Sequence, residues 1–489
     1  MEKPNILFII TDQQRADTLG AYGSTVGATP TLDRLAENGC RFDRAYCNNP
    51  LCMPSRATMF TGRYPSVHGV RTNGVTAHPD QPLLAEQLTQ AGYDTAAFGK
   101  LHYHPGSSDT PDGYWPEHRD TMKKLEDLTQ PYLGFQTLRG GFGHGDVMQG
   151  LHARELQGHH PEIYASRGSK GALEAPDELL QHAQKIQTYK TAIPTEHYPT
   201  NWVVDRTIEY LEEVEGPFFA FCSINDPHHP FCPPGDYWHR FAPEDMPPSI
   251  RREGELDDKP PHFKGFYEGA YKDIDTDGFL LGSDPYLSEE RVQIIQAAYY
   301  GMVALLDDGI ARIMDALRAR NLEENTIVLF LSDHGELLGD HGLILKGAFH
   351  YQTLMQVPLL AYAPGIIPAG HVVNGPVGLI DLYATLIELA GGEMPEGTQA
   401  QSLVPQLMGE TREGREHVYI EHDVDPLALR LRTLITDQWR VTHYAGETYG
   451  ELYDLKNDPN EFVNLWDRNV GVRREMQAQL LDVMAQNQS

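Results

Sequence analysis

The most informative residues lie near the N-terminus, where a cysteine precedes a Pro-Ser-Arg sequence. Cys52 is followed by Pro54, Ser55 and Arg56, in a pattern typical of the start of a helix. Backbone N–H groups and the helix dipole at such a start favour an anion. A thiolate nucleophile is one interpretation of Cys52. A cysteine phosphatase loop is excluded, because it needs its arginine further from the cysteine than Arg56 is.

Two aspartates far apart in the chain each follow a short apolar run. Asp12 stands in the sequence Thr-Asp-Gln-Gln, and Asp333 stands in Ser-Asp-His-Gly. Carboxylate oxygens suit hard divalent cations such as Ca²⁺, Mg²⁺ and Mn²⁺. Taken singly, an aspartate in such a place more often caps the following helix than binds a metal. Both interpretations stay open on these residues alone.

The segments around these residues predict alternating strands and helices. Short apolar runs that end in polar residues or glycine predict buried parallel strands at 5–10, 94–98, 218–224, 326–332 and 357–362. Apolar residues at helical spacing predict helices at 31–37, 83–90, 202–213 and about 291–320. This alternation predicts a large mixed, mostly parallel sheet between two layers of helices. Functional groups in such sheets gather beyond the carboxyl ends of the strands.

Two long stretches and a C-terminal change of pattern complete the predicted organisation. Inserts at about 103–200 and 233–288 are rich in Gly, Pro, His and Asp, and we expect them to shape a pocket. Beyond a catalytic domain at 1–395, short strands and an amphipathic helix predict a smaller domain of antiparallel sheet plus helix at 396–489. The predicted fold class is therefore α/β with a C-terminal addition.

Composition limits the partners and the compartment. The 489 residues carry a formal net charge of −30, so nucleic acid and anionic lipid surfaces are unexpected partners. No apolar run reaches the roughly 18 residues that a membrane helix needs. The five cysteines show no C-x-x-C spacing, which argues against a disulfide framework and a zinc ribbon. We expect a cytoplasmic protein.

The cysteine segment resembles the signature of a known enzyme family. Cys52-x-Pro-Ser-Arg followed by Thr61-Gly62-Arg63 is similar to the signature of the type I sulfatases, in the alkaline phosphatase superfamily. The resemblance extends over nearly the whole chain, from Pro-Asn-Ile-Leu at 4–7 to Glu-Leu-Tyr-Asp-Leu at 451–455. It implies that Cys52 is oxidised to formylglycine, whose hydrated aldehyde is the nucleophile. A formylglycine-generating enzyme is then an expected partner.

The resemblance also implies one divalent metal ion. The positions that match the family's metal ligands are Asp12, Gln13, Cys52, Asp333 and His334. Gln13 stands where many members have a second aspartate, and His334 adds a softer nitrogen. Ca²⁺, the usual ion of the family, is expected first, and Mn²⁺ and Mg²⁺ stay open.

Three further cationic side chains match catalytic positions of the family. Arg56 is expected to hold the formylglycine oxygens with its planar fork of donors. Lys100, in Gly-Lys-Leu-His, is expected to neutralise a sulfate oxygen, and His102 to accept the proton when bound sulfate is released. Without the resemblance, this lysine and histidine would be interpreted as residues of a solvated loop.

The remaining matched positions lie later in the chain. His228, in Pro-His-His-Pro, is expected to hydrogen-bond the ester oxygen and protonate the leaving group, whereas His229 is expected at the surface. Lys346 is expected to bind sulfate, although Leu345 replaces the glycine often found before it. Asn73 is a candidate substrate contact, with a simple turn residue as an equal alternative.

The resulting functional hypothesis is hydrolysis of a sulfate monoester, with an aryl, small alkyl or sugar leaving group, to an alcohol and inorganic sulfate. The main alternative is a phosphonate monoester or phosphodiester hydrolase of the same superfamily, whose pattern generally lacks the Lys-x-His found at Lys100 and His102. A catalytically inactive binding protein is a third hypothesis. We expect a small-molecule substrate, since the acidic composition disfavours large polyanions. Association into a homo-oligomer stays open.

Overall fold

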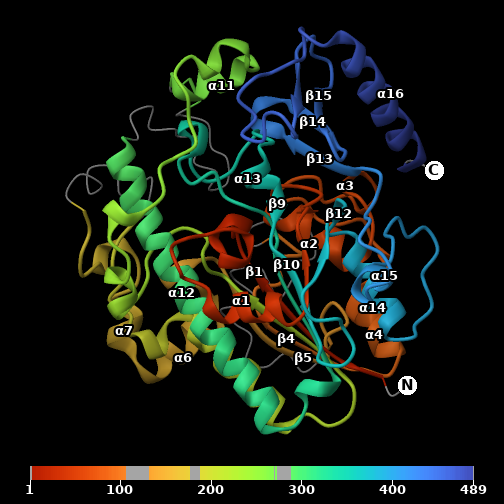
Figure 1. The fold of residues 1–489 in the computed structure, drawn as a ribbon. Helices are drawn as coiled ribbons and strands as arrows, with labels where there is room; N and C mark the ends of the chain where they lie inside the picture. The colour runs from red at the N-terminus through yellow and green to blue at the C-terminus, as the bar shows by residue number, and fades with distance from the viewer. Residues whose placement is uncertain (1–2, 106–130, 177–187, 269, 272–287, 488–489) are drawn as a thin grey trace.

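A nine-stranded mixed sheet lies at the centre of the protein (Figure 1). The computed structural model describes residues 3–105, 131–176, 188–268, 270–271 and 288–487. The strand order is β11-β2-β10-β8-β1-β7-β4-β5-β6. The strands are β1 (Asn5–Thr11), β2 (Cys40–Phe42), β4 (Asp94–Gly99), β5 (Thr137–Phe142), β6 (Gln149–Gly150), β7 (Phe218–Ile224), β8 (Thr326–Ser332), β10 (Leu359–Tyr362) and β11 (His371–Val373).

The middle of this sheet is parallel, as the sequence predicted. Strands β8, β1, β7, β4 and β5 pair in parallel, and β1, β7 and β8 are buried along their whole length. Strands covered on both faces need apolar side chains on both, which explains the nearly continuous apolar runs. The predicted α/β fold class is confirmed.

The prediction of one parallel strand at 357–362 is wrong. The segment divides into β9 (Gln356–Val357) and β10, and β10 pairs antiparallel with both β8 and β2. Pro358 stands between the two pieces and cannot donate a backbone hydrogen bond. Strand β9 joins a small separate sheet, whose other strands are β3 (Ala45–Tyr46) and β12 (Val377–Gly378).

Helices cover both faces of the main sheet (Figure 1). One layer consists of α1 (Pro30–Glu37), α10 (Pro199–Glu213) and α12 (Glu289–Ala319). The other consists of α2 (Cys52–Thr61), α4 (Leu84–Gln90) and α14 (Asp381–Leu389). Alternate residues of β1 pack against the two layers. Leu7 and Ile9 pack against the first layer, and Ile6, Phe8 and Ile10 against the second.

The insert predicted at 103–200 contains more regular structure than expected. Strand β5 extends the main sheet beside β4, and two helices follow, α6 (Leu151–His159) and α7 (Pro161–Ala165). Gly140 and Gly141 within β5 removed the apolar pattern that would have revealed a strand. The second insert carries short 3-10 turns and α11 (Pro261–Tyr267). The parts of the inserts at 106–130, 177–187, 269 and 272–287 lie outside the described residues.

The C-terminal part is an antiparallel sheet covered by one helix. Its strands, in spatial order, are β13 (Val418–Val424), β14 (Leu429–Ile435), β15 (Trp439–Tyr444) and β16 (Gly450–Asp454). The last of these was not predicted. Helix α16 (Val470–Asn487) packs Met476, Leu480 and Val483 into one cluster with apolar residues of the sheet. The domain boundary near residue 395 stays a prediction.

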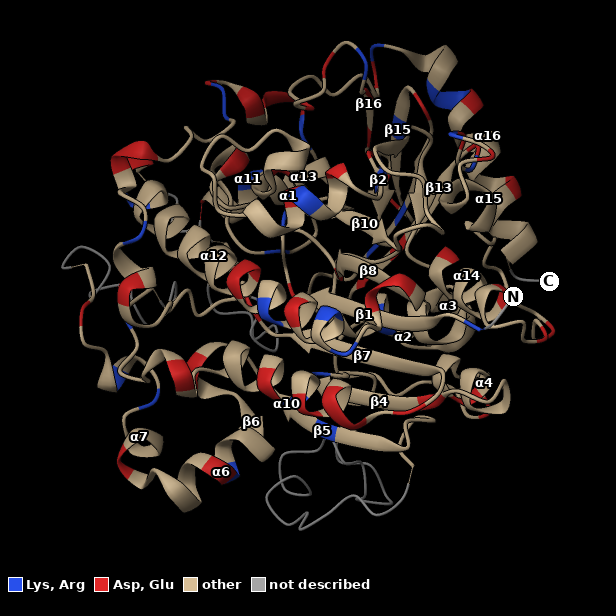
Figure 2. Ribbon diagram, turned by 60° about the horizontal axis from the view of Figure 1, so that its bottom comes forward, with Lys and Arg blue, Asp and Glu red and all other residues tan. Residues whose placement is uncertain are grey.

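Within the described residues, the remaining short helices are α3 (Pro65–His68), α13 (Gln352–Met355) and α15 (Val404–Leu407). Acidic side chains spread over the outer helices and loops, while the central strands are almost free of charge (Figure 2). Within the described ranges no helix has the length and apolar character needed to cross a membrane. All five cysteines are free and buried.

Two buried histidines join the C-terminal sheet to the rest of the protein. His350 Nδ1 lies 2.7 Å from Thr433 Oγ1, and its Nε2 lies 3.1 Å from Nδ1 of His422 on β13. Burial lowers the pKa of His422 to about 3 and holds the pKa of His350 well below its ordinary value. Both imidazoles are therefore neutral in the folded protein at neutral pH.

This pair predicts a loss of stability in mild acid. Below pH 6.5 the unfolded chain protonates His422 while the folded protein does not, so the free energy of unfolding falls as the pH falls. At pH 5 that loss is about 2 kcal/mol. His422→Phe cannot take up the proton, so its stability deficit relative to the parent should shrink by this amount between pH 8 and pH 5. Urea unfolding at both pH values measures it.

The matched control is His159→Phe, because His159 is exposed on α6. Its unfolding free energy should follow that of the parent at both pH values. A deficit of His422→Phe that is equal at pH 8 and pH 5 would contradict the prediction.

Candidate active site

Four strand ends meet at one edge of the main sheet. Thr11 at the end of β1 pairs with Ser332 of β8 and with Ile224 of β7, while Gly99 of β4 pairs with Ser223 of β7. Side chains that follow these ends therefore start from one level of the sheet. Those predicted to act at the site are Asp12, Lys100 and Asp333.

Helix α2 presents its first residue, Cys52, to this edge. Arg56 lies one turn further on the same face of the helix, and its guanidinium is fully buried. Nε donates to Asp333 Oδ2 at 2.8 Å, and Nη1 donates to the Lys100 carbonyl at 2.8 Å and to Ser223 Oγ at 2.9 Å. Arg56 thus ties the helix to the ends of three strands, β8, β4 and β7.

Lys346 lies directly against the cysteine. Its Nζ is 3.0 Å from Cys52 Sγ, 3.1 Å from His228 Nε2 and 3.0 Å from His334 Nε2. His334 Nε2 is also 3.2 Å from Cys52 Sγ. His228 Nδ1 donates to the carbonyl of His229 at 2.6 Å, which fixes the tautomer and leaves Nε2 as an acceptor. The structure therefore brings these predicted residues together.

Lys100 contributes a second ammonium group to the site. Its Nζ contacts Asp12 and lies 2.6 Å from Nε2 of His144. The His144 ring stacks on His228 with centroids 3.5 Å apart and an interplanar angle of 9°. His144 lies in the first insert and was missed by sequence reasoning. Its setting between two glycines, just beyond a strand, is the one local signal that could have identified it.

A network of hydrogen bonds anchors the loop that carries His144. The carboxylate of Asp146 accepts from Tyr189 Oη at 2.8 Å and from Thr191 Oγ1 at 2.6 Å. The side-chain amide of Asn225 donates to the carbonyl of Gly143. Because Asn225 directly follows β7, the loop of His144 is fixed to the same sheet edge as His228.

Gln13 fits the metal position through one atom of its side chain. Its backbone N–H donates to Asp333 Oδ1 at 3.1 Å, and its Nε2 donates to the Glu336 carboxylate. Its Oε1 is buried and has no hydrogen-bond partner among the described residues. The amide oxygen is therefore available as a ligand.

Asn73 and His102 lie near the site with less defined contacts. Asn73 Oδ1 accepts from the backbone N–H of Met53 at 3.2 Å, so its role as a substrate contact stays a prediction. His102 has a left-handed backbone with φ of 53°, and its buried Nδ1 finds no partner in the described part of the chain. The prediction of a surface position for His229 is wrong, because its half-buried ring stacks on His228 at 4.2 Å.

Opposite charges control ionisation in this buried cluster. Burial opposes the charge on Asp12, but Lys100 and Arg56 outweigh it and hold the pKa of Asp12 well below its ordinary value. Burial and Asp12 oppose a thiolate at Cys52, yet Lys100 and Lys346 lower the pKa of its thiol. Burial lowers the pKa of His102, His144 and His228, and Lys100 or Lys346 adds to the effect. These three imidazoles are neutral.

The donor set suits one divalent cation. Ligand atoms of Asp12, Cys52, Asp333 and His334 all lie within 4.8 Å of one another. Gln13 is tied to this group by the hydrogen bond from its backbone N–H to Asp333, and its buried Oε1 has no partner among the described residues. Two carboxylates, an amide oxygen and an imidazole match Ca²⁺, Mn²⁺ or Mg²⁺ better than a soft ion. The residues present therefore fit the metal that the sequence predicted.

Comparison with known families identifies the fold and the family. The family described as sulfatase matches residues 4–392, and the family described as N-sulphoglucosamine sulphohydrolase, C-terminal, matches residues 339–488. The chain belongs to the sulfatase family. Membership of this family makes it an enzyme of the sulfuric ester hydrolase class.

Individual relatives cover almost the whole of this sulfatase. It is 29% identical to the uncharacterized sulfatase YidJ of Escherichia coli over 99% of this chain and 88% of that protein. It is 28% identical to an arylsulfatase of Clostridium perfringens over 95% of this chain and 90% of that one. The phosphonate monoester hydrolase of Agrobacterium radiobacter superposes with a TM-score of 0.82 at 27% identity, covering 99% of this chain and 96% of that one.

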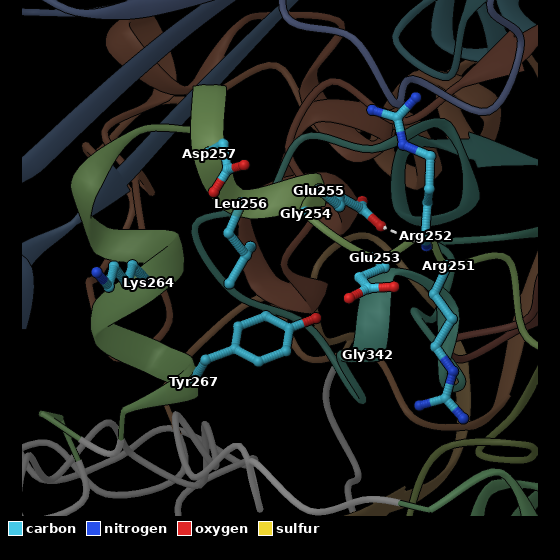
Figure 3. A pocket seen from close by; sticks show the side chains of 10 residues that line it. All are labelled: Arg251, Arg252, Glu253, Gly254, Glu255, Leu256, Asp257, Lys264, Tyr267 and Gly342. Atoms are coloured by element: carbon cyan, nitrogen blue, oxygen red, sulfur yellow. Dashed lines mark hydrogen bonds between the residues drawn. The ribbon is translucent and has the colours of Figure 1, made fainter.

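A separate cavity of about 800 Å³ lies in the second insert of the sulfatase (Figure 3). Its lining includes Arg251, Arg252, Lys264 and Tyr267, together with acidic residues of the same segment. Glu255, one of its lining residues, pairs with the buried side chain of His341. The residues described as lining it include none of those predicted to act on substrate.

The charges around Cys52 predict a reactive thiol in protein made without a maturing enzyme and freed of metal. Lys100 and Lys346 lower the pKa of Cys52, whereas burial raises the pKa of Cys40 and Cys222 to about 12. At pH 7 iodoacetamide should therefore alkylate Cys52 faster than the other cysteines, because the thiolate is the nucleophile. Peptide mass spectrometry over time measures the rates.

Lys346→Met should slow this alkylation of Cys52, since it removes an ammonium 3.0 Å from the sulfur. Lys264→Met is the matched control, because Lys264 is an exposed lysine on α11. Equal rates for Cys52 and Cys222 in the parent, or equal slowing by both variants, would contradict the prediction.

Proposed function

We propose that this sulfatase hydrolyses a small sulfate monoester, with an aryl, alkyl or sugar leaving group, to an alcohol and inorganic sulfate. The observation that carries the proposal is the position of Lys100 and Lys346. Lys346 Nζ lies 3.0 Å from Cys52 Sγ, and Lys100 Nζ contacts Asp12, whose carboxylate lies 3.5 Å from the same sulfur. Arg56 donates to the Lys100 carbonyl, so three cations gather around this position, and such a cluster attracts an anionic group with several oxygens.

These cations supply the largest stabilisation of the reaction. Lys100, Lys346 and Arg56 are each almost or fully buried, so water weakens their fields little. Hydrogen bonds to Asp12, Asp333 and neighbouring groups hold them in place before the substrate arrives. Preorganised charge of this kind acts where negative charge develops on the transferring group.

His228 is the proposed acid for the leaving group. Its Nε2 accepts a hydrogen bond from Lys346 Nζ at 3.1 Å, and the same atom would hold the proton that the departing ester oxygen takes up. Burial and His144 lower the pKa of His228, so a proton held there would pass readily to a departing alkoxide. His102, whose pKa is also lowered by burial, is the proposed acceptor of the proton lost when sulfate is released.

His144 forms the outer wall of the leaving-group side. About 26% of its side chain is exposed, whereas His228 beneath it is buried. A planar or cationic leaving group would lie against the exposed ring. The acceptor contact with Lys100 and the stack on His228 keep that ring in one orientation.

The proposal also includes formylglycine, formed after translation, and a bound metal ion. Formylglycine formed from Cys52 by a formylglycine-generating enzyme would provide a hydroxyl nucleophile for sulfur. One divalent ion would be held by Asp12, Gln13, Asp333 and His334. Ca²⁺ is expected first, with Mn²⁺ or Mg²⁺ as alternatives. The ion would add positive charge at the nucleophile and the sulfate. The free cysteines and acidic composition support a cytoplasmic protein without a nucleic-acid partner.

A phosphonate monoester or phosphodiester hydrolase is the second candidate function. The superposition on the Agrobacterium phosphonate monoester hydrolase favours it. Lys100 and His102 favour the sulfate ester, because the phosphonate pattern generally lacks this pair. A catalytically inactive binding protein is disfavoured, since most of the predicted polar side chains are joined in one buried cluster around Cys52.

One prediction of the proposed function concerns the nucleophile. When the protein is produced with a maturing enzyme, the tryptic peptide 45–56 should contain one alkylatable thiol, that of Cys47, because Cys52 has become formylglycine. Mass spectrometry after denaturation and alkylation measures this. Cys47 serves as the internal control for complete alkylation. Two alkylated thiols in fully active protein would refute the formylglycine route.

The second prediction separates the two ester classes. Lys100→Ala should reduce turnover of a sulfate ester by on the order of 10²–10³, because it removes a cation aimed at the transferring group. His102→Ala should release alcohol in a burst and then turn over slowly, since the proton acceptor for sulfate release is missing. Stopped-flow detection of an aryl alcohol on a panel of sulfate and phosphonate esters measures both.

Lys264→Ala and His159→Ala are the matched controls, because both residues are exposed and lie outside the site. Their kinetics should equal those of the parent. If phosphonate esters were preferred over every sulfate, and Lys100→Ala and His102→Ala stayed nearly as active as the parent, the phosphonate function would replace the sulfate one.

A further inference from the structure

One buried carboxylate beneath the active site has no part in the chemistry described above. Glu336 lies two residues after His334, and its side chain is fully buried. Its Oε2 accepts from the side-chain amide of Gln13. Its Oε1 accepts from the backbone N–H of Leu338 at 3.0 Å and from the backbone N–H of Leu345. One carboxylate thus binds three donors from three separate positions.

All three of these donors belong to residues with a strained backbone. The φ angles are 65° at Gln13, 47° at Leu338 and 65° at Leu345. This left-handed region suits glycine, because in other residues Cβ approaches the following carbonyl oxygen. Such conformations persist only where the surrounding contacts impose them. The Glu336 carboxylate is the contact that the three share.

Two of the three residues set the position of reactive groups. Gln13 follows Asp12, and with its Nε2 bound to Glu336 its buried Oε1 is left without a hydrogen-bond partner among the described residues. Leu345 precedes Lys346, whose Nζ lies against Cys52. The left-handed backbone at 345 therefore sets where the ammonium group starts. A glycine at 345 would adopt this backbone unaided, whereas leucine needs a hydrogen bond to hold it.

We propose that Glu336 is a positioning residue that couples the two halves of the site, orienting the Gln13 oxygen toward the metal position and Lys346 toward the sulfate position. The inference rests on the proposed function for the identity of the ion and the ester. A carboxylate suits this place because it offers acceptors to all three donors. A glutamine of equal size would turn an NH₂ group toward at least one N–H.

The test begins with Glu336→Gln and the metal alone. Added Ca²⁺ or Mn²⁺ should raise the melting temperature of the metal-free parent, and the concentration needed should rise about 10–100-fold in the variant, as for other groups that orient metal ligands. The same variant should show a raised KM and a lowered kcat on the parent's preferred ester, because Lys346 is displaced. The ion measurement does not depend on catalysis.

The second arm asks whether the backbone at 345 carries the effect. In the Glu336→Gln background, Leu345→Gly should recover at least threefold in kcat/KM, since glycine adopts the left-handed backbone without the carboxylate. It should not recover ion binding, which depends on Gln13. Leu133→Gly is the matched control, because Leu133 also has a left-handed backbone, with φ of 54°, but no contact with Glu336.

Several outcomes overturn the inference. The inference is overturned if Glu336→Gln has the ion affinity and the kinetics of the parent. It is also overturned if Leu345→Gly and Leu133→Gly recover kcat/KM equally in the Glu336→Gln background. If Glu336→Gln does not fold, Glu336→Asp replaces it, and parental ion affinity in that variant overturns the inference. If the parent protein binds no divalent ion, or if it prefers phosphonate esters, the proposed function is refuted and the inference about Glu336 is not. In that case the recovery of activity by Leu345→Gly on the preferred ester decides the role of Glu336.

Discussion

The site depends on the pairing of buried charges at the ends of the central strands. Asp12 and Asp333 have no exposed surface, and neither does Arg56, which contacts both. Removing one partner of such a pair leaves an uncompensated buried charge, which typically costs about 3–5 kcal/mol. Strands β1, β4 and β8 and helix α2 must therefore end at fixed positions relative to one another. The fold around them supplies that precision.

The same charge balance explains what the site would attract. The cations Arg56, Lys100 and Lys346 face two carboxylates, those of Asp12 and Asp333, so once Cys52 is converted to an uncharged aldehyde, as proposed, positive charge is in excess. The proposed divalent ion would increase that excess. An ester anion would reduce it.

The chain has a formal net charge of −30, and acidic residues are spread over its outer helices and loops (Figure 2). A large polyanion would be repelled over most of its contact area, whereas a small anion meets the field of the buried cations once it enters the pocket. The proposal of a small substrate rests on this charge distribution and on the limited exposure of His144 and Lys100.

Much of the fold and site could be predicted, because apolar runs and the Cys-x-Pro-Ser-Arg segment are local signals. Strands β1, β7 and β8 end within one residue of the predicted limits, and Asp12, Arg56 and Lys346 lie together as expected. The division at Pro358 was missed because one residue interrupts an otherwise apolar run. The roles of Asn73 and His102 stay predictions, since neither makes a contact that defines one.

His144 and Glu336 were missed for a deeper physical reason. His144 reaches the site through tertiary contacts, the Asp146 network and the bond from Asn225 to Gly143, and none of these leaves a pattern in the neighbouring sequence. Glu336 was invisible because its effect is exerted on the backbone of other residues.

Several residues of this site have a left-handed backbone that their side chains disfavour. Leucine occupies position 345, where a glycine is often found in the family, and the backbone there still has the left-handed φ that glycine favours. Gln13 and His102 show the same conformation on other loops of the site. Strain of this kind must be offset by contacts elsewhere, and it clusters at functional sites because geometry there is selected for chemistry. A side chain unsuited to its backbone, once seen in a structure, therefore directs attention to the hydrogen bond that holds it.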